Sequence, residues 1–159
     1  MTKQLLVRMN AEFKELDHEL KSTLPDEIAR AAALGDLSEN AEYEAALDRQ
    51  RLLQSKYRTL KNRINEVAQI DMTRLSSSKS GYGSIVEVFD LDNDLDKSYQ
   101  LVMPEDADVK RNRISVGSPI GKALMGRSEG DEVVIQIPSG TKNYEITNVT
   151  TYVNTEQDL

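Results

Sequence analysis

The sequence predicts an α+β protein in which a long helical hairpin is followed by a small antiparallel sheet with one short helix. In residues 1–75 the apolar side chains recur at intervals of three and four, the period of an amphipathic helix. Beyond residue 82 they recur at every second position, the period of a strand. A polar, serine-rich stretch separates the two patterns. We therefore expect a hairpin domain over 1–75, a linker over 76–81 and a second domain over 82–159.

Two amphipathic segments form the predicted hairpin. They are joined near Gly35, and two helices joined by a short loop are typical of an antiparallel helical hairpin. Pro25 falls inside the first arm, where we expect it to kink an otherwise continuous helix. The apolar stripe comprises Met9, Phe13, Leu16 and Leu20 in the first arm and Leu53, Tyr57, Leu60, Ile64 and Val67 in the second.

The charges on the two arms are complementary. Residues 12–27 hold six acids and two bases, while residues 49–65 hold six bases and no acid. An antiparallel hairpin brings these segments side by side, so ion pairing between the arms is one interpretation of the bases. Each exposed pair contributes only about 0.2–1 kcal/mol. A basic face left free for RNA or for a protein partner is the alternative.

The second domain is predicted to be a small twisted antiparallel sheet. Ser118 and Pro119 are typical of a helix start, and Gly126 is typical of a helix end, so the segment between them is expected to be the one short helix. Residues with strand periodicity, bounded by turn signals, lie at 85–89, 99–103, 133–137 and 144–149.

Composition excludes several functional classes. The chain has no cysteine and a single histidine, His18, which excludes disulfides, thiol catalysis and zinc sites built on thiolates. No apolar run approaches the ~18 residues that span a bilayer, and no signal peptide is recognisable, so we expect a cytoplasmic protein without a membrane partner. A net charge of −7 disfavours general binding to nucleic acid, because phosphate contacts need local positive charge.

The predicted tip of the hairpin is strongly acidic. Asp36 and Glu39 have the spacing of a capping box, in which Asp36 would cap the second helix and Glu39 would return to its backbone N–H. Alternatively, they form an exposed carboxylate pair that serves a hard cation such as Mg²⁺, which two carboxylates cannot hold unaided. Residues 31–48 carry no base and five acids, namely Asp36, Glu39, Glu42, Glu44 and Asp48.

Two motifs carry a resemblance to a known family. The tip segment 33–43, Ala-Leu-Gly-Asp-Leu-Ser-Glu-Asn-Ala-Glu-Tyr, resembles the signature of the GreA/GreB transcript-cleavage factors of bacterial RNA polymerase. Segment 114–126, Ile-Ser-Val-Gly-Ser-Pro-Ile-Gly-Lys-Ala-Leu-Met-Gly, resembles the C-terminal domain of the same family. The two motifs stand in the family's order and spacing, so the resemblance covers nearly the whole chain, and it is closer to the GreA type.

The resemblance implies a coiled-coil N-terminal domain and an FKBP-like C-terminal domain in a monomer that is not itself an enzyme. In this family the C-terminal domain docks at the rim of the polymerase secondary channel, and the coiled coil reaches the active centre. By resemblance, Asp36 and Glu39 would be the catalytic pair that shares Mg²⁺ with the polymerase. They would promote cleavage of backtracked nascent RNA near its 3′ end. Gly117, Ser118 and Pro119 would be the docking loop.

The basic face departs from the family pattern. Several members carry arginines beside the tip that form a patch for RNA, whereas Ala32 and Leu47 occupy those places here. The nearest substitutes for an RNA-binding face are Arg30, Arg49 and Arg51. Asn40 and Tyr43 are assigned by resemblance to support of the tip.

Two other functions stay open at this point. A secondary-channel binder that modulates transcription without stimulating cleavage is one, and the intact acidic pair argues against it. A prolyl isomerase is the other, because the second domain is expected to be FKBP-like. Such an enzyme needs an apolar, aromatic-lined pocket, for which the second domain offers Phe89, Tyr82, Tyr99, Tyr144 and Tyr152.

Overall fold

The structure is a computed structural model that describes residues 2–71 and 74–152. The chain divides into two compact units, residues 1–70 and 71–159, and each is described by itself. The α+β fold class predicted from the sequence is confirmed, since the first unit is a helical hairpin and the second a mainly antiparallel sheet. Among the described residues, none of the helices has the length and apolar character needed to span a membrane.

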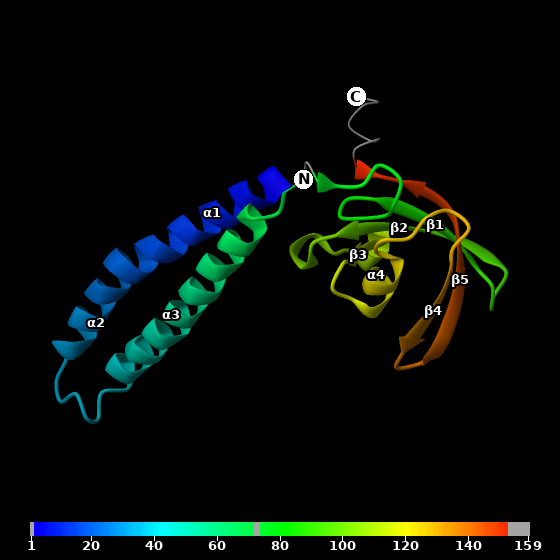
Figure 1. Cartoon of the computed structure of the whole chain (residues 1–159). Coiled ribbons are helices and arrows are strands. Elements are labelled where there is room, and N and C mark those ends of the chain that lie inside the picture. The colour runs from blue at the N-terminus through cyan, green and yellow to red at the C-terminus, as the bar shows by residue number, and fades with distance from the viewer. Residues whose placement is uncertain (1, 72–73, 153–159) are drawn as a thin grey trace. The chain divides into compact units, whose positions relative to one another are not determined.

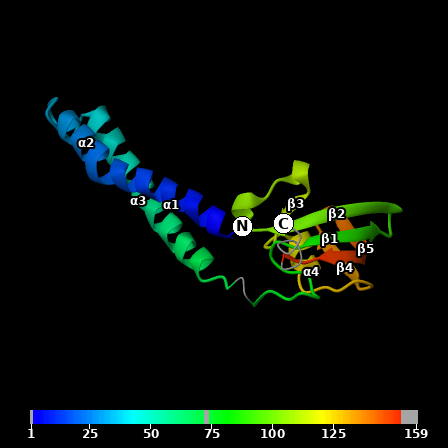
Figure 2. The same ribbon diagram turned by 90° about the horizontal axis from the view of Figure 1, so that it is seen from above.

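The first unit consists of two antiparallel helical arms, which lie side by side in both views (Figures 1 and 2). The first arm contains α1 (Thr2–His18), a π-helical segment (Glu19–Thr23) and α2 (Leu24–Ala32), and the second arm is α3 (Ala41–Ala68). Every predicted stripe position is buried or half-buried, which confirms the helical periodicity. Between the arms the rings of Phe13 and Tyr57 pack with their centroids 4.6 Å apart.

Pro25 disturbs the first arm through the hydrogen bonds that precede it. The arm stays helical throughout, as expected, but residues Glu19–Thr23 adopt the wider π form. There the N–H of Leu24 donates to the carbonyl of Glu19, five residues earlier. Pro25 then lies in the first turn of α2, where the ring's fixed backbone angle suits a helix.

The second unit is a five-stranded sheet in the order β3-β2-β1-β5-β4. Its strands are β1 (Ile85–Asp90), β2 (Leu95–Val102), β3 (Arg113–Ser115), β4 (Glu132–Ile137) and β5 (Gly140–Thr150). Neighbouring strands pair antiparallel except β2 and β3, which are parallel. The predicted antiparallel sheet is thus confirmed in its main part, but β3 and its parallel pairing were not among the predicted strand segments. That strand has three residues, too few to show alternation.

One short helix, α4 (Pro119–Leu124), lies beside the curved sheet (Figure 1). It buries Leu124 in the core of the sheet, and Ile120 and Ala123 pack against the same core. The predicted start and end of this helix are confirmed, because Ser118 is the N-cap and Gly126 has a positive φ of 70° just beyond the helix. The buried core consists of Val86, Val88, Leu101, Leu124, Val133, Ile135, Tyr144 and Ile146.

Candidate functional site at the hairpin tip

The tip is the loop between α2 and α3. Helix α2 ends at Ala32, and Gly35 follows with a φ of +145°, a conformation that side-chain-bearing residues rarely adopt. Helix α3 begins at Ala41, and its N-cap is Asn40, whose side chain accepts a hydrogen bond from the N–H of Tyr43. The expectation that Asp36 caps this helix was wrong, because the helix starts five residues after Asp36.

Asp36 instead closes a turn within the loop. Its Oδ1 accepts hydrogen bonds from the backbone N–H of Ser38 at 3.0 Å and from the Ser38 hydroxyl at 2.9 Å. These two bonds hold the pKa of the Asp36 carboxyl below its ordinary value. The carboxylate is thus held ionised and fixed through one oxygen, while the other oxygen, Oδ2, has no hydrogen-bond partner among the described residues.

Glu39 lies in the same turn and its side chain is exposed. Its backbone N–H donates to the carbonyl of Asp36 at 3.4 Å, which keeps the two residues in one turn. Across residues 2–71 and 74–152, neither carboxylate has an ion-pair partner. A hollow of about 430 Å³ opens beside them, lined by Leu34, Gly35, Asp36, Glu39, Asn40, Ala41 and Glu42. Two oxygen-bearing acids therefore face solvent without a compensating cation.

This donor set suits a hard cation but is incomplete for one. Carboxylate oxygens are the ligands that Mg²⁺ takes in proteins, usually one or two of them together with waters and substrate phosphates. Within the described residues there is no group of three or more histidine, cysteine, aspartate or glutamate side chains placed to hold a metal ion. Asp36 and Glu39 could therefore contribute to a site that another molecule completes.

Asn40 and Tyr43, the predicted tip supports, lie where the second arm begins. Asn40 is half-buried and makes two hydrogen bonds, one to the start of α3 and one to the carbonyl of Ala31 at the end of α2. Tyr43 is half-buried in the first turn of α3. The bond to Ala31 was not predicted, since no local pattern indicates a contact between residues nine positions apart.

The three candidate basic residues have different surroundings. Arg49 donates to the carboxylate of Glu19 on the opposite arm, which raises the pKa of Arg49. Arg51 pairs with Asp48 one turn earlier on the same helix at 2.7 Å. Arg30 is exposed and has no ion-pair partner among the residues described. Arg49 therefore pairs between the arms, as the first interpretation of the bases expects. Of the three candidate bases, Arg30 is the one without an ion-pair partner among the described residues.

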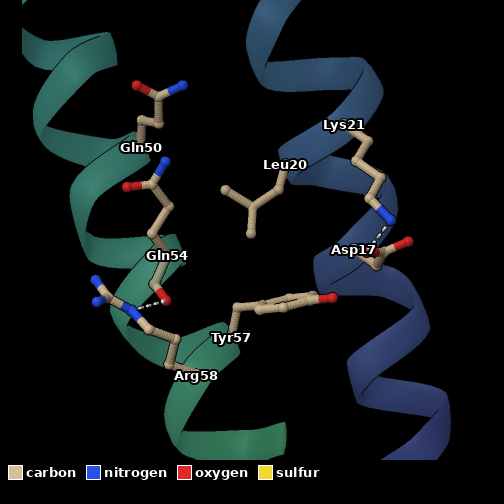
Figure 3. Close-up of a pocket in the computed structure, with 7 residues that line it drawn as sticks. All are labelled: Asp17, Leu20, Lys21, Gln50, Gln54, Tyr57 and Arg58. Carbon is tan, nitrogen blue, oxygen red and sulfur yellow. Dashed lines mark hydrogen bonds and ion pairs between the residues drawn. The ribbon is translucent and has the colours of Figure 1, made fainter.

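A second hollow, of about 490 Å³, lies midway along the arms (Figure 3). It borders the π-helical segment, and in Figure 3 Leu20 and Tyr57 extend into the gap from opposite arms. Lys21 is bound to Asp17 at 2.7 Å on one side, which raises the pKa of Lys21. The remaining lining comes from Gln50, Gln54 and Arg58 of α3. The acid that lines this hollow, Asp17, is already paired with Lys21, whereas the acids at the tip have no such partner among the described residues.

The predicted docking loop precedes α4 in the second unit. Ser118 uses its hydroxyl internally, accepting from the N–H of Gly121 at 3.0 Å and donating to the carbonyl of Ser115 at 2.8 Å. The N–H of Gly117 donates to the Ser115 hydroxyl at 3.0 Å. Gly117 and Pro119 are exposed. The loop is therefore held by internal hydrogen bonds, and its exposed surface comes from the residues on either side of Ser118.

Sequence reasoning missed one functional candidate, Ser38. An aspartate followed two residues later by a hydrogen-bond donor is typical of an Asx turn, and Asp36-Leu37-Ser38 has that form. This signal competed with the overlapping capping-box pattern. The structure shows that the turn formed and the capping box did not.

Comparisons with known proteins extend over both units. Residues 1–70 match the family described as "Transcription elongation factor, N-terminal", and residues 76–151 match "Transcription elongation factor, GreA/GreB, C-term". The transcription elongation factor GreA of Vibrio parahaemolyticus is 43% identical over 82% of this chain and 83% of its own. That of Rhodospirillum rubrum is 40% identical over 94% and 95%. A solved GreA/GreB structure from Nitrosomonas europaea covers 57% of this chain and 78% of its own, at 26% identity and a TM-score of 0.42.

Proposed function

Because this chain belongs to the GreA/GreB family of transcription elongation factors, we propose that it activates RNA cleavage by bacterial RNA polymerase. It would enter the secondary channel, deliver its tip to the polymerase active centre and stimulate Mg²⁺-dependent cleavage of backtracked nascent RNA. Cleavage would restore a 3′ end that can be extended. The chain would act as an accessory factor, and the polymerase would supply the nuclease centre.

The observation that carries this proposal is the state of Asp36 and Glu39. Both are exposed at the end of a hairpin whose second arm has 28 helical residues, about 42 Å at 1.5 Å per residue. An acidic pair bound by local cations would have no capacity left for a foreign metal. No such cation is paired with them in the part of the chain that the structure describes.

The roles of the two acids follow from their surroundings. Mg²⁺ in such a centre neutralises charge on phosphate oxygens and lowers the pKa of a bound water. Asp36 would present Oδ2, since Ser38 occupies its other oxygen. Glu39 has a free carboxylate on a longer side chain, which suits it to accept a proton from the attacking water or to orient that water. Neither residue could hold the cation without ligands from the polymerase.

The second unit would provide the docking surface. Gly117 and Pro119 are exposed beside a loop held by three hydrogen bonds from the Ser115–Ser118 segment. A rigid loop loses little conformational entropy on binding. The prolyl isomerase alternative is less well supported, because Tyr82 and Tyr144 are only 4% and 0% exposed and so cannot line an open aromatic pocket.

The test is RNA release from a stalled, backtracked polymerase complex with Mg²⁺. Asp36→Asn and Glu39→Gln remove the charge with little change in shape, and each should reduce stimulated cleavage by about 10²-fold or more. Polymerase binding, measured by competition, should be retained. The matched control is Glu15→Gln, which changes an exposed acid on α1 and should leave stimulated cleavage at the wild-type level. Undiminished cleavage by both tip variants would overturn the proposal. If the wild-type chain binds the polymerase but does not stimulate RNA cleavage, the modulator alternative would be established.

A further inference from the structure

Asn40 joins the two arms across the tip through its side-chain amide. Its Nδ2 donates to the carbonyl of Ala31, in the last turn of α2, at 2.6 Å. Its Oδ1 accepts from the N–H of Tyr43, in the first turn of α3, at 3.1 Å. Among the described tip residues, 29–44, this is the one hydrogen-bonded link between the end of α2 and the start of α3. Each half of the amide thus serves a different arm.

Apolar packing near the tip buries too little area to replace this link. A hollow of about 740 Å³ lies between α2 and α3, and its apolar lining is mostly alanine, at positions 31, 33, 45 and 46. Apolar stabilisation scales with the area buried, and an alanine methyl buries little. Closer to the other end of the hairpin, by contrast, Leu5, Met9 and Val67 are buried. The arms are therefore well packed away from the tip and weakly packed beside it.

The tip turn is ordered internally but needs an anchor to both arms. Ser38 and the N–H of Glu39 both bond to Asp36, which fixes the shape of the turn. Those bonds do not fix the separation of the two helices from which the turn projects. The amide of Asn40 does, because it bonds to both helix ends at once.

We propose that Asn40 is a positioning residue that fixes where Asp36 and Glu39 stand relative to the arms. The inference rests on the proposed function of those two acids and adds a residue that acts through them. Its chemistry calls for a short primary amide, which offers a donor and an acceptor on one planar group. A carboxylate there would set an acceptor against the Ala31 carbonyl, and a hydroxyl could cap α3 but could not reach across.

The test compares Asn40→Ser with Asn40→Ala. Serine is a good N-cap, so Asn40→Ser keeps the cap on α3 and loses only the link between the arms, whereas Asn40→Ala loses both. Asn10→Ser is the matched control. It removes the hydrogen bond from Asn10 to the carbonyl of Leu6, which lies within α1 and joins no arms.

Two readouts separate positioning from general stability. At saturating factor, cleavage should fall about 10–100-fold in both Asn40 variants, while the concentration needed for half-saturation of the polymerase changes less than about twofold. In the free protein, hydrogen exchange at amides 34–39 should be faster in both variants. The melting temperature should drop clearly in Asn40→Ala alone. Asn10→Ser should match the wild type in cleavage and in exchange at the tip.

The outcomes distinguish a failure of the positioning role of Asn40 from a failure of the proposed function of Asp36 and Glu39. If Asn40→Ser cleaves like the wild type while Asp36→Asn does not, capping suffices and the positioning role is overturned. If exchange at residues 34–39 is unchanged in Asn40→Ser, the link does not order the tip and the inference fails on structural grounds alone. If Asp36→Asn and Glu39→Gln both cleave normally, the proposed function fails, and with it the catalytic purpose of the link.

Discussion

The Nε of Arg49 lies 3.0 Å from Oε1 of Glu19, and this ion pair ties α3 to the π-helical segment of the first arm. The side chains are 55% and 30% exposed, so water weakens their attraction. The pair nevertheless changes how the basic residues of the second arm are understood. An arginine engaged across the hairpin is a structural group first, whatever charge it also offers to RNA.

The first prediction separates these two roles of Arg49. Arg49→Ala and Glu19→Gln should each destabilise the hairpin slightly, and a double-mutant cycle on thermal unfolding should give a coupling of about 0.2–1 kcal/mol. If pairing is the whole role, both single variants should affect cleavage alike. A loss of cleavage in Arg49→Ala together with normal or increased cleavage in Glu19→Gln would show instead that Arg49 contacts RNA. Lys21→Ala, which breaks the pair with Asp17 within the first arm, is the control.

The second prediction concerns Ser118 and Pro119, which stand side by side but differ in exposure. Ser118→Ala removes the N-cap of α4 and should cost about 1 kcal/mol of stability in the second unit. Pro119→Ala should change stability by less than about 0.5 kcal/mol, since Pro119 is exposed. In competition binding, however, Pro119→Ala should weaken the affinity for polymerase. Unchanged affinity in Pro119→Ala would remove this residue from the docking surface.

The third prediction concerns the close approach of α4 to Ser115. A Cβ on Gly121 would lie 1.9 Å from the Ser115 carbonyl oxygen, so Gly121→Ala must move the helix or the loop. We expect a loss of about 1–3 kcal/mol in the second unit, measured by chemical unfolding. The control is Gly117→Ala, whose nearest contact would be the Ser115 hydroxyl at 3.4 Å. Equal stability of the two variants would contradict the tight packing of α4.

The predictable parts of this fold are those that depend on local pattern. The stripe from Leu53 to Val67 was recognised because each position repeats the helical period, and Ser118 was recognised because its capping partner is three residues away. Strand β3 was missed because three residues carry no period, and its pairing depends on β2, more than ten positions earlier.

The tip shows the same limit within a few residues. Asp36-Leu37-Ser38-Glu39 fits both a capping box and an Asx turn, and local sequence does not choose between them. The choice depends on where α3 begins, which is set at Asn40. The bond from Asn40 to Ala31 exists only once the hairpin closes. Exposure of the acidic pair could thus be foreseen from charge, whereas the groups that hold it in place could not.

The fourth prediction concerns the pH dependence of the second unit. Asp90 is fully buried at the end of β1, where Lys97 donates to its Oδ2 at 2.6 Å and the N–H groups of Asp92 and Asn93 donate to its Oδ1. The side chains of Lys97 and Asn93, with the backbone of Asp92, lower the pKa of Asp90 to about 2. In an unfolded chain an aspartate has a pKa of about 3.9.

The sign of the effect follows from these two values. The folded pKa lies below the unfolded one, so the ionised carboxylate stabilises the fold fully above about pH 5, and this stabilisation is lost as the pH falls towards 2. Asp90→Asn lacks the titrating group. Its urea midpoint, followed at the amide of Val88 by NMR, should be lower than that of the wild type at pH 7 and should change less between pH 5 and 2. Asp96→Asn, an exposed acid on the facing strand, should keep the wild-type pH profile. Parallel profiles for Asp90→Asn and the wild type would show that Lys97 and the turn N–H groups do not hold the Asp90 charge in the folded protein.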